Sequence, residues 1–209
     1  MAYLGNQVAP LVQALEGKEL KLDSDGDSSI QASTDDTVVF KTNGSNRWTL
    51  NSSGNLFPAS TSQGIVLGAT SDTEANRLDD FEQGDWTVVL KEGANTLTTS
   101  SDTNGKYNKI GNMVTVFCTI FNITKSGTGD LTVEGLPFQS SIFSSSAIQF
   151  ARFTSAGSGV PIARLDENTS VVMLRYLTSG NSNDTAILAS NIASSSTSDI
   201  RFTLTYRTS

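Results

Sequence analysis

Four carboxylates lie close together near the middle of the chain, at Asp79, Asp80, Glu82 and Asp85. Paired carboxylates hydrolyse glycosidic bonds when they face each other across a cleft, about 5–10 Å apart. All four occupy one short segment, and copies of this segment around a symmetry axis would crowd together instead of flanking a substrate. We therefore expect them to accept hydrogen bonds from Arg77 or from backbone N–H groups of a turn. Around a threefold axis they can also hold a cation, although no ligand spacing supports this.

A second acidic run, Asp23-Ser24-Asp25-Gly26-Asp27, resembles the first half of a calcium-binding loop. The EF-hand loop needs Gly at its sixth position and Glu at its twelfth, where this chain has Ser28 and Thr34. The run is therefore interpreted as a solvated turn, and no metal site is predicted.

The composition excludes histidine-dependent chemistry. The 209 residues contain no histidine and a single cysteine, Cys118. Cys118 lies in the apolar run 113–120, where no neighbour lowers the pKa of its thiol, so we expect a small buried residue. No glycine-rich phosphate loop follows a strand and opens a helix. The sequence therefore predicts no enzyme, no catalytic residue and no cofactor.

The charge and hydropathy of the chain argue against two classes of partner, nucleic acids and membranes. The net charge is −7 and no basic stripe is present, which argues against a nucleic-acid groove. No stretch approaches the ~20 apolar residues of a membrane span, so no membrane insertion is predicted. The first residues lack the charged and apolar regions of a secretory signal, and we expect synthesis in the cytoplasm of a host cell.

Residues 86–209 have the pattern of an antiparallel β-sandwich. Runs rich in β-branched and aromatic residues alternate with polar residues, and turns containing glycine or serine separate them. This part of the chain is long enough to bury its own core. We therefore expect an all-β, jelly-roll-like knob at 86–209. The clearest runs are 86–90, 109–123, 131–133, 147–153, 171–177 and 200–206.

Residues 19–70 repeat a shorter pattern that cannot bury itself. Apolar pairs with period-two spacing predict short strands, and polar turns separate them. Burying two side chains gains about 3–5 kcal/mol, whereas ordering the backbone costs about 1–2 kcal/mol per residue. We therefore predict an intertwined trimeric β-stem, in which the apolar faces of other copies cover this segment. The expected packing residues are Leu22, Ile30, Val38, Phe40, Trp48, Leu50, Ile65 and Leu67.

Two further segments flank the stem. Residues 1–18 have apolar residues at helical spacing, and they either anchor the chain to a larger assembly or start the trimer as a short helix. The candidate anchoring residues are Tyr3, Leu4, Val8, Leu11 and Val12. Residues 71–85 form an acidic neck, in which Leu78 and Phe81 are spaced for one helical turn. Trp86 follows as the third apolar residue assigned to the neck.

Several short motifs resemble one protein family. They are Leu78-Asp79-Asp80-Phe81-Glu82-Gln83-Gly84-Asp85-Trp86-Thr87, Tyr107-Asn108-Lys109-Ile110-Gly111-Asn112-Met113-Val114-Thr115-Val116, Thr128-Gly129-Asp130-Leu131, Gly135-Leu136-Pro137-Phe138 and Thr205-Tyr206-Arg207-Thr208. In this order they resemble the globular knobs of bacteriophage tail fibres and related virion appendages, frequent in marine and cyanobacterial phages. The segments Asp35–Thr42 and Asn51–Leu56 resemble the repeats that precede such knobs. The resemblance covers roughly residues 20–138 and the last strand.

The resemblance implies a homotrimer in the virion, on the tail or the outer surface, that contacts a host surface glycan or protein. Other virion proteins are the expected partners of the N-terminus. Many relatives carry long shafts, whereas this chain has almost none, which fits a short fibre, a baseplate appendage or a capsid-surface fibre. The first interpretation is therefore a tail fibre that binds the host. A trimeric capsid decoration or head fibre is the alternative, and a polysaccharide-degrading tailspike is a lesser one.

Receptor contacts are predicted by residue type alone, because aromatic residues and arginines are enriched at binding hot spots. The candidates are Tyr107, Arg164, Arg175 and Tyr176. Tyr107 also lies in a family motif, which favours packing in the core or between subunits. For the two arginines, a solvated position on a strand is the favoured interpretation.

Overall fold

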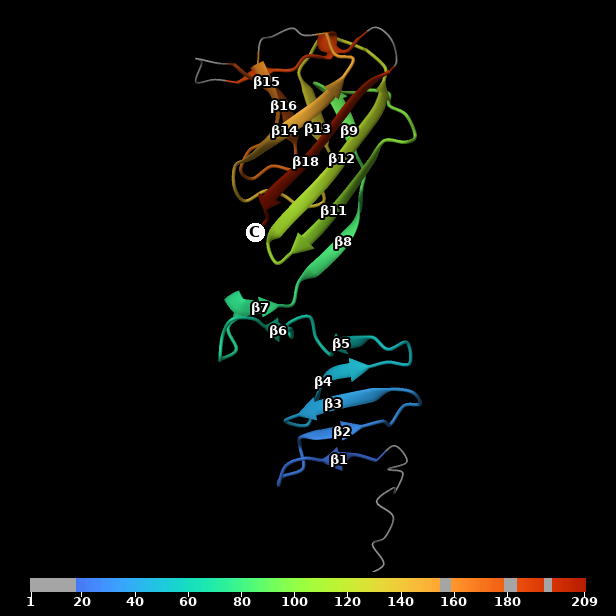
Figure 1. Ribbon diagram of the computed structural model, residues 1–209, viewed down its shortest axis with the longest axis vertical. Helices are drawn as coiled ribbons and strands as arrows, with labels where there is room; N and C mark the ends of the chain where they lie inside the picture. The colour runs from blue at the N-terminus through green and yellow to red at the C-terminus, as the bar shows by residue number, and fades with distance from the viewer. Residues whose placement is uncertain (1–17, 155–158, 179–183, 194–196) are drawn as a thin grey trace, which may run out of the picture. The chain divides into compact units, whose positions relative to one another are not determined.

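A computed structural model describes residues 18–154, 159–178, 184–193 and 197–209 (Figure 1). The chain divides into two compact units, with the boundary between Asp79 and Asp80. We call them the stem unit (18–79) and the knob unit (80–209). The described residues form antiparallel strands and two short 3₁₀ turns without an α-helix, so the prediction of an all-β chain is confirmed. None of these elements is a helix long and apolar enough to cross a membrane. The predicted anchor residues Tyr3, Leu4, Val8, Leu11 and Val12 lie outside the described residues.

The main sheet of the stem unit is an antiparallel meander in the order β1–β2–β3–β4–β5. The strands are β1 (Leu20–Lys21), β2 (Ser29–Gln31), β3 (Val38–Thr42), β4 (Ser45–Leu50) and β5 (Leu56–Pro58). Asn43 and Gly44 form the loop between β3 and β4, and both have positive φ, 51° and 64°. Two such residues make a type I′ turn, whose twist matches that of paired strands. The Asn-Gly pair therefore fixes this hairpin locally.

A small second sheet in the stem unit pairs β6 (Ile65–Val66) with β7 (Arg77–Leu78), and the 3₁₀ turn η1 (Glu74–Asn76) precedes β7. The helical turn predicted from Leu78 and Phe81 is wrong. Leu78 pairs with Ile65 in this sheet, and Phe81 begins β8 of the knob unit. Pairing with a distant strand satisfies the backbone groups that an isolated helical turn leaves free, and local spacing does not reveal such a partner.

The knob unit is one antiparallel sheet that curls into two layers. Its strands follow the order β10–β9–β13–β16–β15–β14–β18–β12–β11–β8, and β17 pairs with β16. Their bounds are β8 (Phe81–Trp86), β9 (Val89–Glu92), β10 (Asn95–Thr96), β11 (Asn104–Ile110), β12 (Met113–Ile123), β13 (Leu131–Glu134), β14 (Ser144–Ala151), β15 (Gly159–Leu165), β16 (Val172–Thr178), β17 (Thr185–Ala186) and β18 (Ser198–Arg207). The second 3₁₀ turn, η2, spans Ala189–Asn191.

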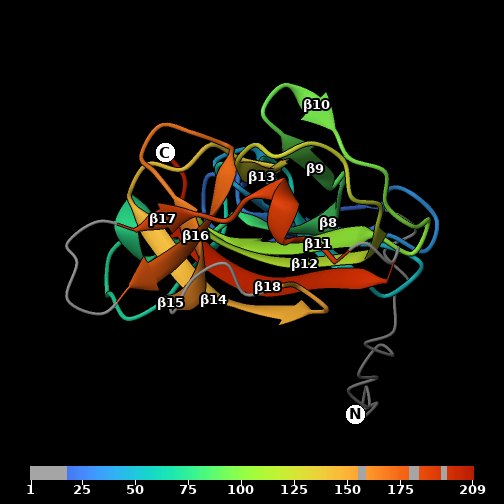
Figure 2. The same ribbon diagram turned by 90° about the horizontal axis from the view of Figure 1, so that it is seen from above.

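Strand β14 belongs to both layers of the knob unit. Residues 144–147 pair with β15, whereas residues 148–151 pair with β18. One layer therefore contains β8, β11, β12, β18 and the second half of β14, and the other contains β9, β10, β13 and β15–β17 (Figure 2). This arrangement confirms the predicted antiparallel sandwich.

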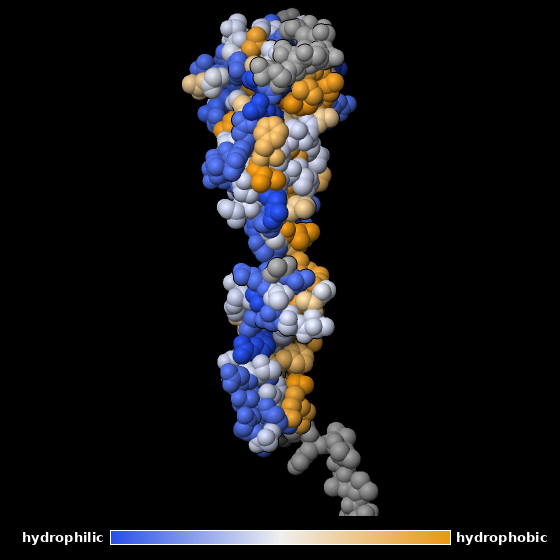
Figure 3. Space-filling model, turned by 90° about the vertical axis from the view of Figure 1, so that its left-hand side faces the viewer, coloured by the Kyte–Doolittle hydropathy of each residue, from blue (hydrophilic) through white to orange (hydrophobic). Residues whose placement is uncertain are grey.

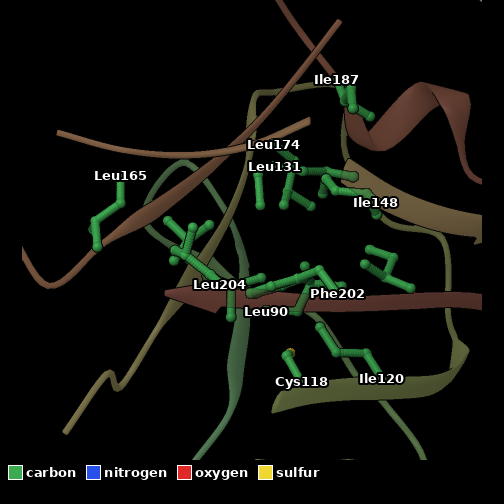
Figure 4. Close-up of a cluster of buried hydrophobic side chains, with 14 of the residues drawn as sticks. Leu90, Cys118, Ile120, Leu131, Ile148, Leu165, Leu174, Ile187, Phe202 and Leu204 are labelled. Atoms are coloured by element: carbon green, nitrogen blue, oxygen red, sulfur yellow. The ribbon is translucent and has the colours of Figure 1, made fainter. Parts of the chain in front are cut away.

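Side chains from both layers meet in one hydrophobic core (Figure 4). Leu90, Leu131 and Leu174 come from β9, β13 and β16 of one layer. Ile120 and Leu204 come from β12 and β18 of the facing layer. Buried and exposed side chains alternate along β12 and β18, as the period-two pattern predicts. The knob unit is therefore built around a core of its own.

Cys118 lies in this core with 2% of its surface exposed, so its predicted burial is confirmed. Burial raises the pKa of its thiol well above the ordinary value, because the thiolate loses its hydration. We expect no reaction with Ellman's reagent in the folded protein, and one thiol per chain after unfolding in guanidinium chloride. A fast reaction of the folded protein would contradict the burial.

Candidate functional site

Residues of the first two sequence motifs take part in two glycine–aromatic pairs. Across β8 and β11, Gly84 lies opposite Tyr107 and Gly105 lies opposite Trp86. A Cβ atom on Gly105 would lie 2.4 Å from the Trp86 ring, and one on Gly84 would lie 2.9 Å from the Tyr107 ring. Each ring covers the glycine of the neighbouring strand, an arrangement that compensates for the missing side chain in a sheet.

A polar cluster continues from these pairs into the interior of the knob unit. Lys109, only 8% exposed, forms an ion pair with Asp80, and its ammonium lies 5.5 Å from the centroid of the Phe138 ring. The Tyr107 ring packs against Phe138 edge-on, with centroids 5.5 Å apart. The Tyr206 hydroxyl donates to the carbonyl oxygen of Phe138 over 2.9 Å. These motif residues therefore bind one another, which is a structural role.

The four carboxylates predicted as a neck cluster each have a separate partner. Asp79 lies 3.6 Å from Arg77, as expected. The expectation that these carboxylates accept hydrogen bonds from the backbone of a neck turn is wrong. The segment from Phe81 is an extended strand, and the other three carboxylates pair with side chains of β11. Glu82 and Asp85 are three residues apart in β8 and point to opposite faces, so they do not face each other across a cleft. The pairs with β11 are Asp80–Lys109, Glu82–Tyr107 and Asp85–Lys106.

The two arginines predicted as receptor contacts share one carboxylate. Arg164 donates to Asp184 over 2.9 Å and to Asp166 over 2.7 Å. Arg175 donates to the other oxygen of Asp184 over 3.0 Å, and it lies 3.8 Å from Asp130. Burial alone raises the pKa of Asp184, but the two guanidinium groups outweigh it and hold the pKa below the ordinary value of 3.8. Both arginines are therefore engaged within the knob unit.

The Asp184 cluster gives the knob unit a specific pH dependence. Because the folded pKa of Asp184 is depressed, its contribution is complete above the unfolded pKa and disappears as the pH falls through the folded pKa. Asp184→Asn is expected to lower the free energy of unfolding by about 2 kcal/mol at pH 7, and the difference from wild type should shrink below about pH 4. Urea unfolding at several pH values measures it. Asp130→Asn, at a 62% exposed side chain, is the control and should cost much less; equal losses would contradict the assignment.

The remaining predicted contacts are aromatic. Tyr176 is 7% exposed and belongs to the hydrophobic core, so the expectation that it lies on the surface is wrong. It alternates with Arg175 along β16, and a single strand pattern does not say which of its two faces is covered. Tyr107 is half-buried and donates to Glu82, which raises the pKa of its phenol.

The run Asp23-Ser24-Asp25-Gly26-Asp27 forms a turn, as predicted. The carboxylate of Asp23 accepts hydrogen bonds from the backbone N–H groups of Gly26 and Ser28. Asp23, Asp25 and Asp27 place carboxylate oxygens within 4.8 Å of one another, the one such group in the described residues. Partial burial and the neighbouring charges of Asp25 and Asp23 raise the pKa of Asp27. The backbone of the turn satisfies the Asp23 carboxylate, and we assign no cation to these three residues.

The stem unit exposes a continuous apolar surface on one face of its main sheet. Cross-strand pairs place Leu20, Ile30, Phe40, Trp48 and Pro58 in one row. A second row on the same face contains Val38, Leu50 and Leu56. We call these two rows the stem face. Apolar side chains gather along one side of the stem unit in Figure 3, and the other side is hydrophilic.

No other part of the stem unit covers the stem face. Leu56 is 57% exposed and Phe40 is 39% exposed. Among residues 18–79 whose burial is described, Ser29 is buried and no apolar side chain is. Phe40, Trp48, Leu56 and Ile65 line an open hollow of about 480 Å³. All eight predicted packing residues lie in this unit as exposed or half-buried side chains: Leu22, Ile30, Val38, Phe40, Trp48, Leu50, Ile65 and Leu67.

The knob unit carries a second surface that the sequence did not single out. On the outside of the β8–β11–β12–β18 layer, Phe117 is 44% exposed and separates two hollows of about 360 and 460 Å³. We call this surface the outer sheet face. Around Phe117 its outward side chains are Gln83, Asp85, Lys106, Asn108, Thr119, Ala147, Gln149, Arg201 and Thr203. Period-two alternation identified the strand containing Phe117, but no signal distinguished this residue from a core position.

Comparison with solved structures shows a similarity of fold. No protein-family model matches the sequence, and the search of curated proteins found no match. The fold is similar to the crystal structure of the Dettilon tailspike protein (gp208), with a TM-score of 0.52 and 20% sequence identity. The match covers 61% of this chain and 24% of the tailspike chain, so this chain spans about a quarter of that protein's length. At this identity the similarity concerns the fold, and part of the chain therefore shares its fold with a phage tailspike.

Proposed function

We propose that the chain is a bacteriophage virion appendage of the tail-fibre type, which assembles as a homotrimer and binds the host cell surface through its knob unit. In this proposal the stem unit is the assembly element and the knob unit is the binding element. Residues 1–18 attach the fibre to other virion proteins.

The exposed stem face carries the proposal. A sheet with one apolar face must cover that face to be stable in water. The knob unit has its own core and the stem unit has none, so the stem unit gains its stability from other copies. Contiguous exposed apolar surface of this kind is typical of interfaces. Three copies wound around one axis bring three stem faces into a common core and close the assembly by symmetry.

The fold similarity to a phage tailspike supports the virion assignment, together with the ordered motifs from 78 to 138. We propose binding in place of hydrolysis, because the neck carboxylates are each engaged by a cation or a phenol. Three identical knobs on one fibre, and several fibres on one particle, convert weak binding at each site into avidity.

Competition for adsorption tests the proposal. Purified full-length protein is added in excess to host cells before the virus that encodes the chain, and free virus is counted. Blocked adsorption by a protein of about three times the 22.2 kDa chain mass is expected. Unchanged adsorption with a folded trimer would contradict the receptor role and favour a capsid decoration. A monomer at micromolar concentration would contradict the assembly.

A further inference from the structure

The outer sheet face of the knob unit combines one exposed ring with unpaired amide groups. Gln83 and Asn108 lie side by side on β8 and β11, and Gln149 lies beside Arg201 on β14 and β18. Within the described part of the chain, the side-chain amides of Gln83, Asn108 and Gln149 make no hydrogen bond. An amide offers both an acceptor oxygen and two donor hydrogens.

Phe117 stands between these amides. It lies opposite Lys106 on β11 and Thr203 on β18, and both hollows share its ring as a wall. The floor of the hollows is formed by backbone, because the alternate residues Cys118 and Phe202 point into the core. The ring is therefore held on a strand of the sheet and offers an apolar surface between the two hollows.

The charges of the outer sheet face are already paired. Lys106 lies 2.6 Å from Asp85, and Arg201 lies 3.3 Å from Asp199 with its guanidinium 4.9 Å from the Phe121 ring. The two cations are balanced by the two carboxylates, so these four residues give the face no net charge that would attract an anionic or a cationic ligand. This favours an uncharged ligand.

We propose that the outer sheet face binds a neutral oligosaccharide, with sugar units in the two hollows and the ring of Phe117 between them. Sugar hydroxyl groups donate and accept hydrogen bonds, as the unpaired amides require, and the apolar face of a sugar ring packs against an aromatic ring. Both hollows fall within the volume range of small-molecule sites, about 300–1,000 Å³. This inference rests on the proposed function and names the chemical class of its receptor.

A second copy of the chain is the competing occupant of this surface. Phe81, Ile110 and Met113 form an exposed apolar row at one end of the same face, paired across β8, β11 and β12. The region around Phe117 differs from that row, because its neighbours are amides, hydroxyls and paired charges. We therefore assign the hollows to sugar, and the oligomeric state of the variants decides between the two.

The experiment uses full-length protein on an array of bacterial O-antigen and capsular oligosaccharides, with neutral and anionic glycans printed side by side. Wild type is expected to bind neutral glycans. Phe117→Ala and the double variant Asn108→Ala/Gln149→Ala are expected to weaken binding about tenfold or more. Phe143→Ala is the matched control, since Phe143 is a 57% exposed phenylalanine outside the outer sheet face, and it should bind as wild type does.

Three outcomes would overturn the inference: no glycan binding by wild type, binding of anionic glycans alone, or undiminished binding by Phe117→Ala. A change of mass in Phe117→Ala by light scattering would also overturn it, in favour of a contact between copies. Adsorption competition with the same variants separates this inference from the proposed function. If wild type and Phe117→Ala block adsorption equally, the fibre role stands and the sugar site fails; if wild type does not block adsorption, the receptor role itself fails.

Discussion

Gly105→Ala is expected to destabilise the knob unit by about 3 kcal/mol, as overpacking of a well-packed core does. The new Cβ atom would lie 2.4 Å from the Trp86 ring, which is 6% exposed and donates from its indole nitrogen to the carbonyl oxygen of Lys106 over 3.2 Å. The ring is packed in the hydrophobic core, so we expect that either the β8–β11 pairing opens or the core repacks. Chemical denaturation followed by circular dichroism measures the loss, and this signal does not depend on Trp86.

A double-mutant cycle identifies the cause of this loss. In a Trp86→Leu background the large ring is absent, and alanine is favoured over glycine within a strand by about 0.5–1 kcal/mol. Gly105→Ala should therefore cost little or nothing in that background, although Trp86→Leu is itself destabilising. A similar cost in both backgrounds would show that the glycine is required for another reason.

The strands of the knob unit could be predicted because each one carries a complete local signal. In 113–123 and 200–206, apolar residues recur at every second position, and this pattern predicts a strand with one covered face. The turn between β3 and β4 has a local signal too, because Asn and Gly are the residues that its positive φ angles favour. The neck was mispredicted, because the spacing of Leu78 and Phe81 is compatible with a helical turn or with two extended segments. The strand that pairs with Leu78 lies thirteen positions earlier in sequence, at Ile65, and only that long-range pairing decides between them.

The candidate contact residues could be predicted less well, because their roles depend on neighbours that are distant in sequence. Arg164 and Arg175 have the composition of a binding site, but Asp184 lies between them after folding. Tyr176 and Phe117 are both aromatic residues in alternating strands, yet the first is buried and the second exposed. The difference is set by which face of each strand packs on the other layer, and this is a property of the sandwich.

The stem face is expected to control assembly. Phe40→Asp/Leu56→Asp places two charges on adjacent rows of the stem face, where burial against another copy would remove the hydration of both carboxylates. The mass from light scattering should fall from about three times to one times 22.2 kDa at micromolar concentration. The knob unit has a separate core, so its cooperative unfolding transition should persist in the variant.

Phe57→Asp is the matched control, because it adds a charge in the same strand on the opposite face of the sheet. Phe57 pairs with Thr49 and is 44% exposed, whereas its neighbour Leu56 pairs with Leu50 on the stem face. A face-specific interface predicts that Phe57→Asp keeps the mass of wild type. If both variants dissociate, charge in β5 disturbs the sheet itself, and if neither does, the stem face is not the contact between copies. Only dissociation confined to the stem-face variant fits an assembly that is held together by its apolar rows.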